Sequence, residues 1–465
     1  MHKATTTLVV LLMALAVGCS KSSQGPQATA TPAVVNCAAA EQPSNFPPTP
    51  NTIDSTCATI PKDMNGTGDT QSGPDLYSWL TFVAVNWPVD PTTCTGNSGA
   101  SILTAPPDPV WLSYLSDDEI FVASGSPANW CNGTSLVTAS GARFASAQEA
   151  LAAQRAGRLA KLPPKVRTLA EQHPEVKLFL HHSAKGQALV SVTNLTNVPT
   201  NLKEILDATG QPVTDQNGRF VRYTVNIGPD EYQYIMEKNL WTKAGQQATG
   251  NLDFKPGAAA LGAMEFKAAW KVLGANDDPT HFFTQQAIVY NDENGDPSPG
   301  PNPVTVGLVG LHITHKTGRQ PNWLWSTFVQ TEINKSFNNA SCPASQCPPN
   351  VETAPTPYLE LNPNGSPHNK PAQVQGVSPT TAAALNTTFQ GLLKGTPWAY
   401  YQLISTQWQG GSGPSRTKPA QLGNPILETF VGNTKPYSCL DCHNFAQDFP
   451  GGFKSDFSFA INAKQ

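Results

Sequence analysis

The sequence predicts an α+β fold with an antiparallel-rich sheet, flanking helices and many loops. Two observations predict it. The strand-like segments of this 465-residue chain follow one another through turns instead of alternating with helices, which is the order expected of an antiparallel sheet. The 42 prolines and 36 glycines indicate many loops and turns. A net charge of -4, with no basic tract, argues against a nucleic-acid partner.

Residues 1–18 are expected to be a secretory signal peptide. A basic start at Lys3 precedes an apolar run over 8–17, which is too short to be a transmembrane anchor. The sequence AVGC at 16–19 resembles the lipobox of bacterial lipoproteins, with Ala16 where Leu is more usual. The resemblance implies that Cys19 is lipidated and anchors the protein to a membrane. Ser20 at the next position, rather than Asp, resembles lipoproteins that enteric bacteria sort to the outer membrane. This resemblance implies a location in the outer membrane of a bacterial cell envelope, facing the periplasm or the exterior.

Residues 19–72 are rich in Ser, Thr, Pro and Gly and contain few large apolar side chains. This composition predicts a flexible tether between the lipid and the body. Residues 73–465 are then expected to form a single α+β body, whose last segment is 430–465.

Helices are expected first at 75–88, where a buried helix-like pattern stops at Pro88, and then at 146–162 and 201–210. Strands are expected at 218–227, which alternates after a DQNG turn, and at 263–273, 287–292 and 304–317. Two late helices are expected at 380–395 and 397–408.

Near the end of the chain, Cys439, Cys442 and His443 reproduce the pattern C-x-x-C-H. Two thiols at this spacing can add to the two vinyl groups of a porphyrin, and the adjacent imidazole can ligate the iron. The alternatives are a local disulfide or half of a zinc site, but the sequence has no second C-x-x-C to complete a zinc site. The motif predicts one covalent haem c, with His443 as the proximal iron ligand.

Only 22 residues follow His443, which is too few for an appended cytochrome domain. The porphyrin is therefore expected to lie against the preceding body. The phenylalanines of the last segment could cover it or simply fill the core; they are Phe445, Phe449, Phe453, Phe457 and Phe459.

No methionine lies downstream of the motif, so a second axial ligand must come from upstream. The best candidates are His312 and His315 in GLVGLHITHKT, a glycine-bearing strand that a flat cofactor could approach. Their separation of three places them on opposite faces of a strand. His312 is favoured because it shares its face with Gly310. Other candidate ligands are Met264, His181 and His182. The remaining alternative is an open, five-coordinate iron without a second protein ligand.

Six further cysteines remain, an even number that suits disulfides in an oxidising compartment. Six thiols allow 15 connectivities. Sequence neighbours suggest Cys37 with Cys57, Cys94 with Cys131, and Cys342 with Cys347. The absence of paired histidine spacing disfavours a role as metal ligands.

Several segments from about residue 75 to the end resemble a family of exported bacterial monohaem proteins known as cytochrome c family proteins. They are WLTFVAVNWP, PVWLSYL, GLVGLHITHKTGRQPNWLWSTF, YYQLISTQW, LGNPILETFV and SCLDCHNFAQDFPGGFKSDFSFAI. The resemblance implies haem c and export but no substrate. Family members often continue the Trp-rich motif as TFEH, where this chain has Phe328, Val329 and Gln330, so the activity can differ.

Electron transfer in the cell envelope, with a redox partner protein, is the first functional prediction. The alternative is a haem-dependent oxidoreductase, peroxidase-like or oxygenase-like, with an open iron position. The long body at 73–465, larger than one haem needs for electron transfer, favours this alternative. Its distal groups would be drawn from His312, His315, Lys316, Trp323 and Trp325. A third possibility is a binding protein in which haem is structural. No hydrolase elbow or phosphate loop is present in the sequence.

Overall fold

The computed structural model describes much of the chain from Val34 onward. The described residues are 34–40, 46–47, 50–64, 70–104, 108–122, 124–127, 147–180, 215, 219–257, 260–290, 299–331, 382–410, 417–420, 422–424, 426–427, 438–444, 446 and 452–461. Within these ranges no helix has the length and apolar character needed to cross a membrane. The predicted signal peptide, Cys19 and the predicted helix at 201–210 lie outside the described residues.

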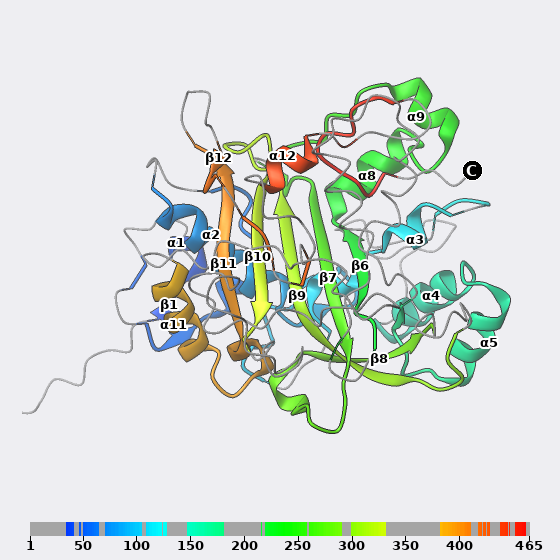
Figure 1. Cartoon of the computed structure of the whole chain (residues 1–465), viewed down its shortest axis with the longest axis horizontal. Helices are drawn as coiled ribbons and strands as arrows, with labels where there is room; N and C mark the ends of the chain where they lie inside the picture. The colour runs from blue at the N-terminus through cyan, green and yellow to red at the C-terminus, as the bar shows by residue number, and fades with distance from the viewer. Residues whose placement is uncertain are drawn as a thin grey trace, which may run out of the picture. The chain divides into compact units, whose positions relative to one another are not determined.

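The described chain is α+β and is built on a large, mostly antiparallel sheet, as the sequence predicts (Figure 1). The strand order is β12-β11-β10-β9-β7-β6, with β8 beside β9 and β5 beside β8. Only the β5–β8 pairing in this sheet is parallel. The strands are β5 Leu178–Leu180, β6 Arg222–Ile227, β7 Met264–Val272, β8 Thr284–Val289, β9 Val304–His315, β10 Leu324–Gln330, β11 Tyr401–Gln409 and β12 Thr417–Lys418. Two small two-stranded sheets pair β1 Val34–Val35 with β2 Thr52–Ile53 and β3 Val89–Asp90 with β4 Thr95–Gly96.

The helices flank this sheet. The α-helices are α1 Cys37–Ala40, α2 Ser72–Val85, α3 Asp117–Ile120, α4 Ala147–Leu159, α5 Pro164–Gln172, α8 Pro229–Glu237, α9 Lys243–Thr249, α11 Ala382–Leu392 and α12 Cys439–His443. Short 3₁₀ helices are η2 Ser55–Ala58, η3 Val110–Ser113, η5 Pro279–His281 and η7 Pro397–Tyr400. The prediction of a helix over 397–408 is wrong, because only its first turn is helical and the rest is strand β11, paired with β10.

Helices α2 and α11 cover one face of the sheet at β10 and β11. Trp79 of α2 stacks on Phe389 of α11 with ring centroids 4.8 Å apart, and its edge meets Phe328 of β10. The Trp79 indole donates to Asn386 Oδ1 at 3.0 Å, and Asn386 also bonds both backbone groups of Leu403 in β11. This apolar layer fixes which face of the sheet is available to the C-terminal segment.

The C-terminal segment lies on the opposite face. Ser326 and Phe328 of β10 point toward α2, whereas Trp325 contacts His443 of α12. Thr327 shares the Trp325 face and accepts a hydrogen bond from Asn424 Nδ2. The two faces of β10 thus separate the α2 layer from the C-terminal segment, as expected for alternating side chains.

The compact unit of the chain begins at Ala33, earlier than the body boundary predicted at residue 73. A disulfide joins Cys37 to Cys57 and confirms that predicted pair. Val35 and Ile53 are buried beside it, so this part of the predicted tether belongs to the body. Cys94 is also disulfide-bonded. Its predicted partner, Cys131, and the pair Cys342 and Cys347 lie outside the described residues.

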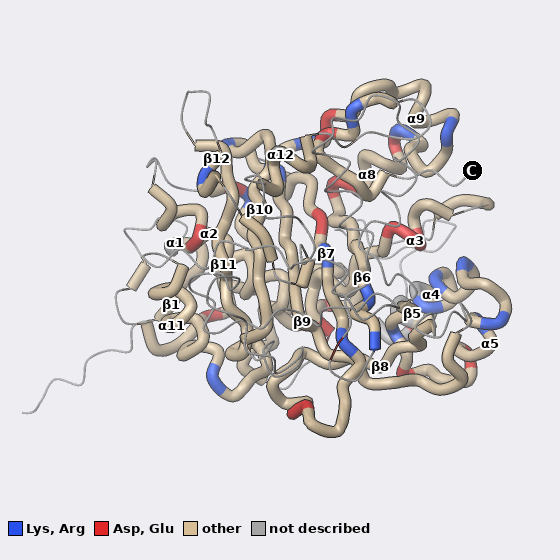
Figure 2. Tube along the Cα trace, viewed as in Figure 1, with Lys and Arg blue, Asp and Glu red and all other residues tan. Residues whose placement is uncertain are grey.

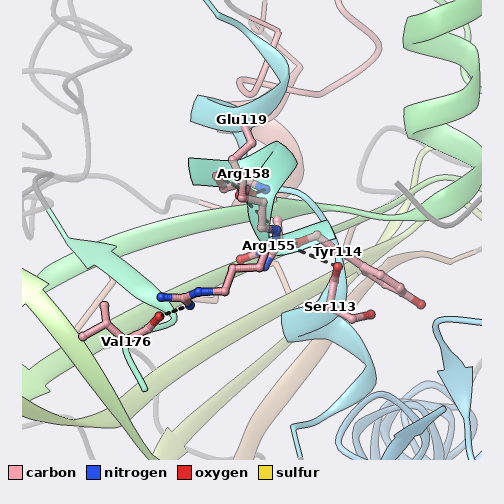
Figure 3. A network of polar contacts seen from close by, with 8 residues as sticks. Ser113, Tyr114, Glu119, Arg155, Arg158 and Val176 are labelled. Carbon is pink, nitrogen blue, oxygen red and sulfur yellow. Dashed lines mark hydrogen bonds and ion pairs between the residues drawn. The ribbon is translucent and has the colours of Figure 1, made fainter. Parts of the chain in front are cut away.

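Figure 2 shows Lys and Arg gathered on α4 and α5 and acidic residues on the neighbouring α3. Two arginines of α4 make hydrogen bonds and an ion pair with neighbouring segments (Figure 3). Arg158 lies 3.0 Å from Glu119 of α3 and donates to the carbonyls of Ser113 and Tyr114. Arg155 donates to three carbonyls, of which the nearest is that of Val176 at 2.7 Å. These contacts attach α4 to the end of α5, to the segment that precedes β5, and to η3 and α3.

Candidate functional site

The C-x-x-C-H motif forms the short helix α12, which rests on β11. The backbone N–H of Leu440 donates to Gln407 Oε1 at 2.9 Å, and the N–H of Cys442 donates to the carbonyl of Ser438. Cys439 is buried and Cys442 is half-buried. Their thiols are not joined to each other. The helix therefore presents both sulfurs and His443 from one turn of chain.

A hydrogen bond to the Phe457 backbone orients His443. Its Nδ1 lies 2.6 Å from the carbonyl oxygen of Phe457. A carbonyl can only accept, so Nδ1 carries the proton and donates it, and the lone pair of the neutral imidazole is on Nε2. Ligating histidines are commonly oriented by such a bond from the other ring nitrogen to a backbone carbonyl. The rings of Trp325 and Phe459 lie 5.2 Å and 4.9 Å from the imidazole.

The Phe457 carbonyl is aimed at His443 by a strained turn. Asp456 and Phe457 have φ values of 50° and 70°, in the left-handed region that side chains disfavour. Asp456 is held there because its Oδ2 accepts from Lys316 Nζ at 2.6 Å and from the Phe254 N–H at 2.8 Å. Strain that neighbouring contacts maintain is typical of functional positions.

His312 lies on the same face of the sheet as the motif. It is directly opposite Thr327 in the β9–β10 register, and Thr327 is two residues after Trp325 on the same strand. Directly opposed residues point to the same face. The side chain of His312 is buried, at 7% exposure. The structure thus places this candidate ligand one row of the sheet from Trp325, whose ring contacts His443.

His315 points to the other face, toward α2. Its Nε2 lies 2.7 Å from the carbonyl oxygen of Leu261, and its Nδ1 lies 2.5 Å from the hydroxyl of Tyr77. Burial lowers the pKa of His315 to about 4, so the ring is neutral, donates from Nε2 and accepts at Nδ1. Both nitrogens are used by protein groups, which gives His315 a structural role in this arrangement. Met264 is opposite His315 in the register and shares that face. His181 and His182 lie outside the described residues.

Two buried indole N–H groups, one of them on the tryptophan that contacts His443, have no acceptor among the described residues. Trp323 and Trp325 are 1% and 2% exposed, and no acceptor in the described part of the chain reaches either Nε1. Their rings are 6.2 Å apart. A buried donor without a partner is costly and rare, and an acceptor supplied by a ligand is one explanation. Sequence reasoning named both tryptophans but not this property.

The residues around α12 fit a haem c. The two thiols suit the porphyrin vinyl groups, and the imidazole tautomer suits the iron. Aromatic rings surround His443, and the indole N–H groups of Trp323 and Trp325 could donate to a haem propionate carboxylate. Phe457 and Phe459 are among these rings, whereas Phe453 is exposed at 36%, and Phe445 and Phe449 lie outside the described residues. Across the described ranges, no group of three or more His, Cys, Asp or Glu side chains could hold a metal ion.

Sequence reasoning missed a buried carboxyl pair under the C-terminal segment. Glu231 of α8 is 0% exposed and interacts with Glu265 of β7. Burial raises the pKa of Glu231 well above its ordinary value, and the neighbouring Glu265 carboxyl raises it further. Burial likewise raises the pKa of Glu265, against a hydrogen bond to Ser458 that lowers it. The two glutamates are far apart in sequence, and no local signal marks them.

Comparison of the chain with models of known families, with curated proteins and with solved structures found no match.

Proposed function

We propose that this protein is an exported c-type monohaem cytochrome that transfers electrons in the bacterial cell envelope. Haem c would be attached to Cys439 and Cys442, with His443 as the proximal iron ligand. The observation that carries the proposal is the hydrogen bond from His443 Nδ1 to the Phe457 carbonyl. It fixes the tautomer that presents Nε2 to a metal.

The protein groups have separate tasks in this proposal. The bound haem would supply one-electron exchange. The Phe457 carbonyl orients the imidazole and increases its basicity, and Trp325, Phe457 and Phe459 exclude water from the proximal side. His312 is the proposed second axial ligand, because it shares the sheet face of the motif while His315 does not.

The alternative function is a haem-dependent oxidoreductase with an open iron position. The buried indole N–H group of Trp323 favours it, because such a donor can hydrogen-bond an oxygen or peroxide bound at a haem. Lys316 is less suited to a distal role, since its ammonium group is held by Asp253 and Asp456.

Mass spectrometry of the denatured, exported protein tests haem attachment. We expect the mass of the chain plus one haem, and the chain mass alone for a Cys439→Ser, Cys442→Ser double variant. A chain mass without haem in the wild type would end the proposal. Carbon monoxide then separates the two functions. A saturated carrier resists the gas in the wild type and in His315→Gln, and binds it readily in His312→Gln, whereas rapid binding by the wild type favours the oxidoreductase.

The proposed location is the cell envelope, lipid-anchored through Cys19, in the outer membrane facing the periplasm or the exterior. The Cys37–Cys57 disulfide supports an oxidising compartment. The proposed partners are the membrane, through the lipid, and a redox protein. Metabolic labelling with a fatty acid tests the anchor: the label should enter the wild type and not Cys19→Ser. Equal labelling of the two would reject lipidation at this residue.

A further inference from the structure

The carboxyl groups of Glu231 and Glu265 interact in the protein interior, beneath the C-terminal segment 452–461. No N–H or hydroxyl donor of the described residues reaches either carboxyl oxygen of Glu231 or Oε1 of Glu265. Ser458, in the segment that covers them, is 1% exposed and interacts with the Glu265 carboxyl. Two carboxylates in contact, away from water, cannot both be ionised. One proton shared between them resolves this conflict, with Glu231 donating to Glu265.

The charges that face this carboxyl pair do not replace the proton. Lys316 is the cation that faces Glu231, but its ammonium group is already bonded to Asp253 and Asp456. Asp456 faces both glutamates and adds negative charge. Lys267, on β7 itself, is the cation that faces Glu265 from its own strand. Carboxyl groups outnumber ammonium groups in this cluster, so a proton remains the means of neutralising it.

Two paths connect the carboxyl pair to His443. Ser458 directly follows Phe457, whose carbonyl accepts from His443 Nδ1. Across the sheet, Glu265 is opposite Thr314, and Thr314 is opposite Trp325. Strand spacing puts Glu265 and Trp325 about 10 Å apart. The Trp325 ring is 5.2 Å from the His443 ring.

We propose that Glu231 and Glu265 form a proton-binding site that holds one shared proton while the iron of the proposed cytochrome is oxidised and binds a second proton more tightly once the iron is reduced. The proposal rests on the haem function argued above. One electron from a redox partner protein converts ferric to ferrous iron, and one proton from water forms an O–H bond on the carboxyl pair. Oxidation of the iron returns the electron to a partner protein and releases the proton to water. A unit charge about 15 Å away, the sum of the steps from Glu265 to Trp325 and from Trp325 to His443, changes the proton affinity of the carboxyl pair about sixfold at an effective dielectric constant of about 20.

The test is the midpoint potential of the haem-loaded protein, followed by visible spectra across pH. The potential should fall as pH rises through the range in which the carboxyl pair titrates, because added protons favour reduction. We expect this slope to be lost in Glu231→Gln and Glu265→Gln. The control is Glu237→Gln, a partly exposed glutamate of the same helix, which should keep it. An unchanged slope in both pair variants would overturn the proposal.

Infrared difference spectra of the wild type give a second readout that needs no variant. Reduction should increase a protonated-carboxyl band, and Glu231→Gln should remove that change. A reduced-minus-oxidised spectrum without such a band would also overturn the proposal. Failure of the haem function itself is recognised separately, because the denatured mass then lacks haem. In that outcome the redox coupling is refuted, and the same infrared band in the haem-free chain reports whether the pair still holds its proton.

Discussion

Replacing Lys316 by methionine is expected to release residues 452–461 from the sheet. The Lys316 side chain is 4% exposed and bonds Asp456 at 2.6 Å, and Asp456 is only 11% exposed. Removal of the ammonium group leaves the Phe254 N–H as the donor to the Asp456 carboxylate within the described part of the chain. Because Asp456 positions the Phe457 carbonyl, the orientation of His443 should loosen together with this segment.

The expected loss in free energy of unfolding is about 3 kcal/mol, the size found when one partner of a mostly buried ion pair is removed. The second ion pair of Lys316 contributes far less. Asp253 is 88% exposed, and exposed ion pairs are worth about 1 kcal/mol or less. Asp253→Asn is therefore the matched control, since it removes an ion pair of Lys316 without uncovering a buried charge.

The size of the loss should depend on pH in a defined direction. Burial raises the pKa of Asp456, whereas the hydrogen bond and charge of Lys316 lower it. Without Lys316 the pKa rises further. Below this pKa the carboxyl is neutral and needs no cation, so the penalty of Lys316→Met is full at neutral pH and shrinks in acid.

Urea unfolding followed by tryptophan fluorescence measures the loss, and amide hydrogen exchange of 452–461 reports release of the segment. Lys316→Met should be much less stable than Asp253→Asn at neutral pH and approach it in acid. Equal stability of the two variants at neutral pH, with unchanged exchange of the segment, would refute the reasoning.

Three other changes have expected outcomes. The pKa of His315 is lowered from 6.5 to about 4, so the neutral ring stabilises the fold fully above pH 6.5, and this contribution is lost as the pH falls from 6.5 to about 4. His315→Gln should therefore make the urea midpoint less dependent on pH within this range. A pH dependence equal to that of the wild type would contradict the prediction. Replacing Cys37 and Cys57 by serine opens a disulfide with a sequence separation of 20 and should lower the free energy of unfolding by about 3 kcal/mol; a reductant should then destabilise the wild type more than the variant. Asn386→Leu leaves the Trp79 N–H and the Leu403 backbone without partners and should cost about 2–4 kcal/mol by thermal or urea unfolding; Trp79→Phe followed by Asn386→Leu should cost less than the sum of the two.

Local patterns predicted much of the fold. Alternation over 304–317 places His312 and His315 on opposite faces, and the register of β9 with β10 bears this out. The helix at 75–88 and the helix at 380–395 are both present, as α2 and α11. These elements carry strong periodic patterns that short-range interactions can satisfy.

The segment 397–408 shows where local patterns fail. A short apolar run can be a buried strand or a helix, and its own periodicity does not decide between them. Here the decision comes from β10, which lies some 70 residues earlier and provides the pairing edge. Composition alone likewise assigned residues 19–72 to a tether. The Cys37–Cys57 disulfide and the buried side chains of Val35 and Ile53 within this range are not visible in composition.

Some residues of the candidate site could likewise be named from the sequence, and others could not. The motif residues Cys439, Cys442 and His443 are contiguous and could be named from the sequence. The Phe457 carbonyl could not be named, because it is a backbone atom whose position depends on the turn at Asp456. The contact of Glu231 with Glu265 depends on packing between α8 and β7, which only the folded chain shows.

Strand β9 is paired along both edges, with β7 on one side and with β8 and then β10 on the other. A strand fixed in this way has little freedom to shift, so His312 is held from both sides. If His312 ligates iron in the proposed electron carrier, it would move little between oxidation states. The reorganisation energy would then be small, and the rate of transfer would depend mainly on the approach of the partner.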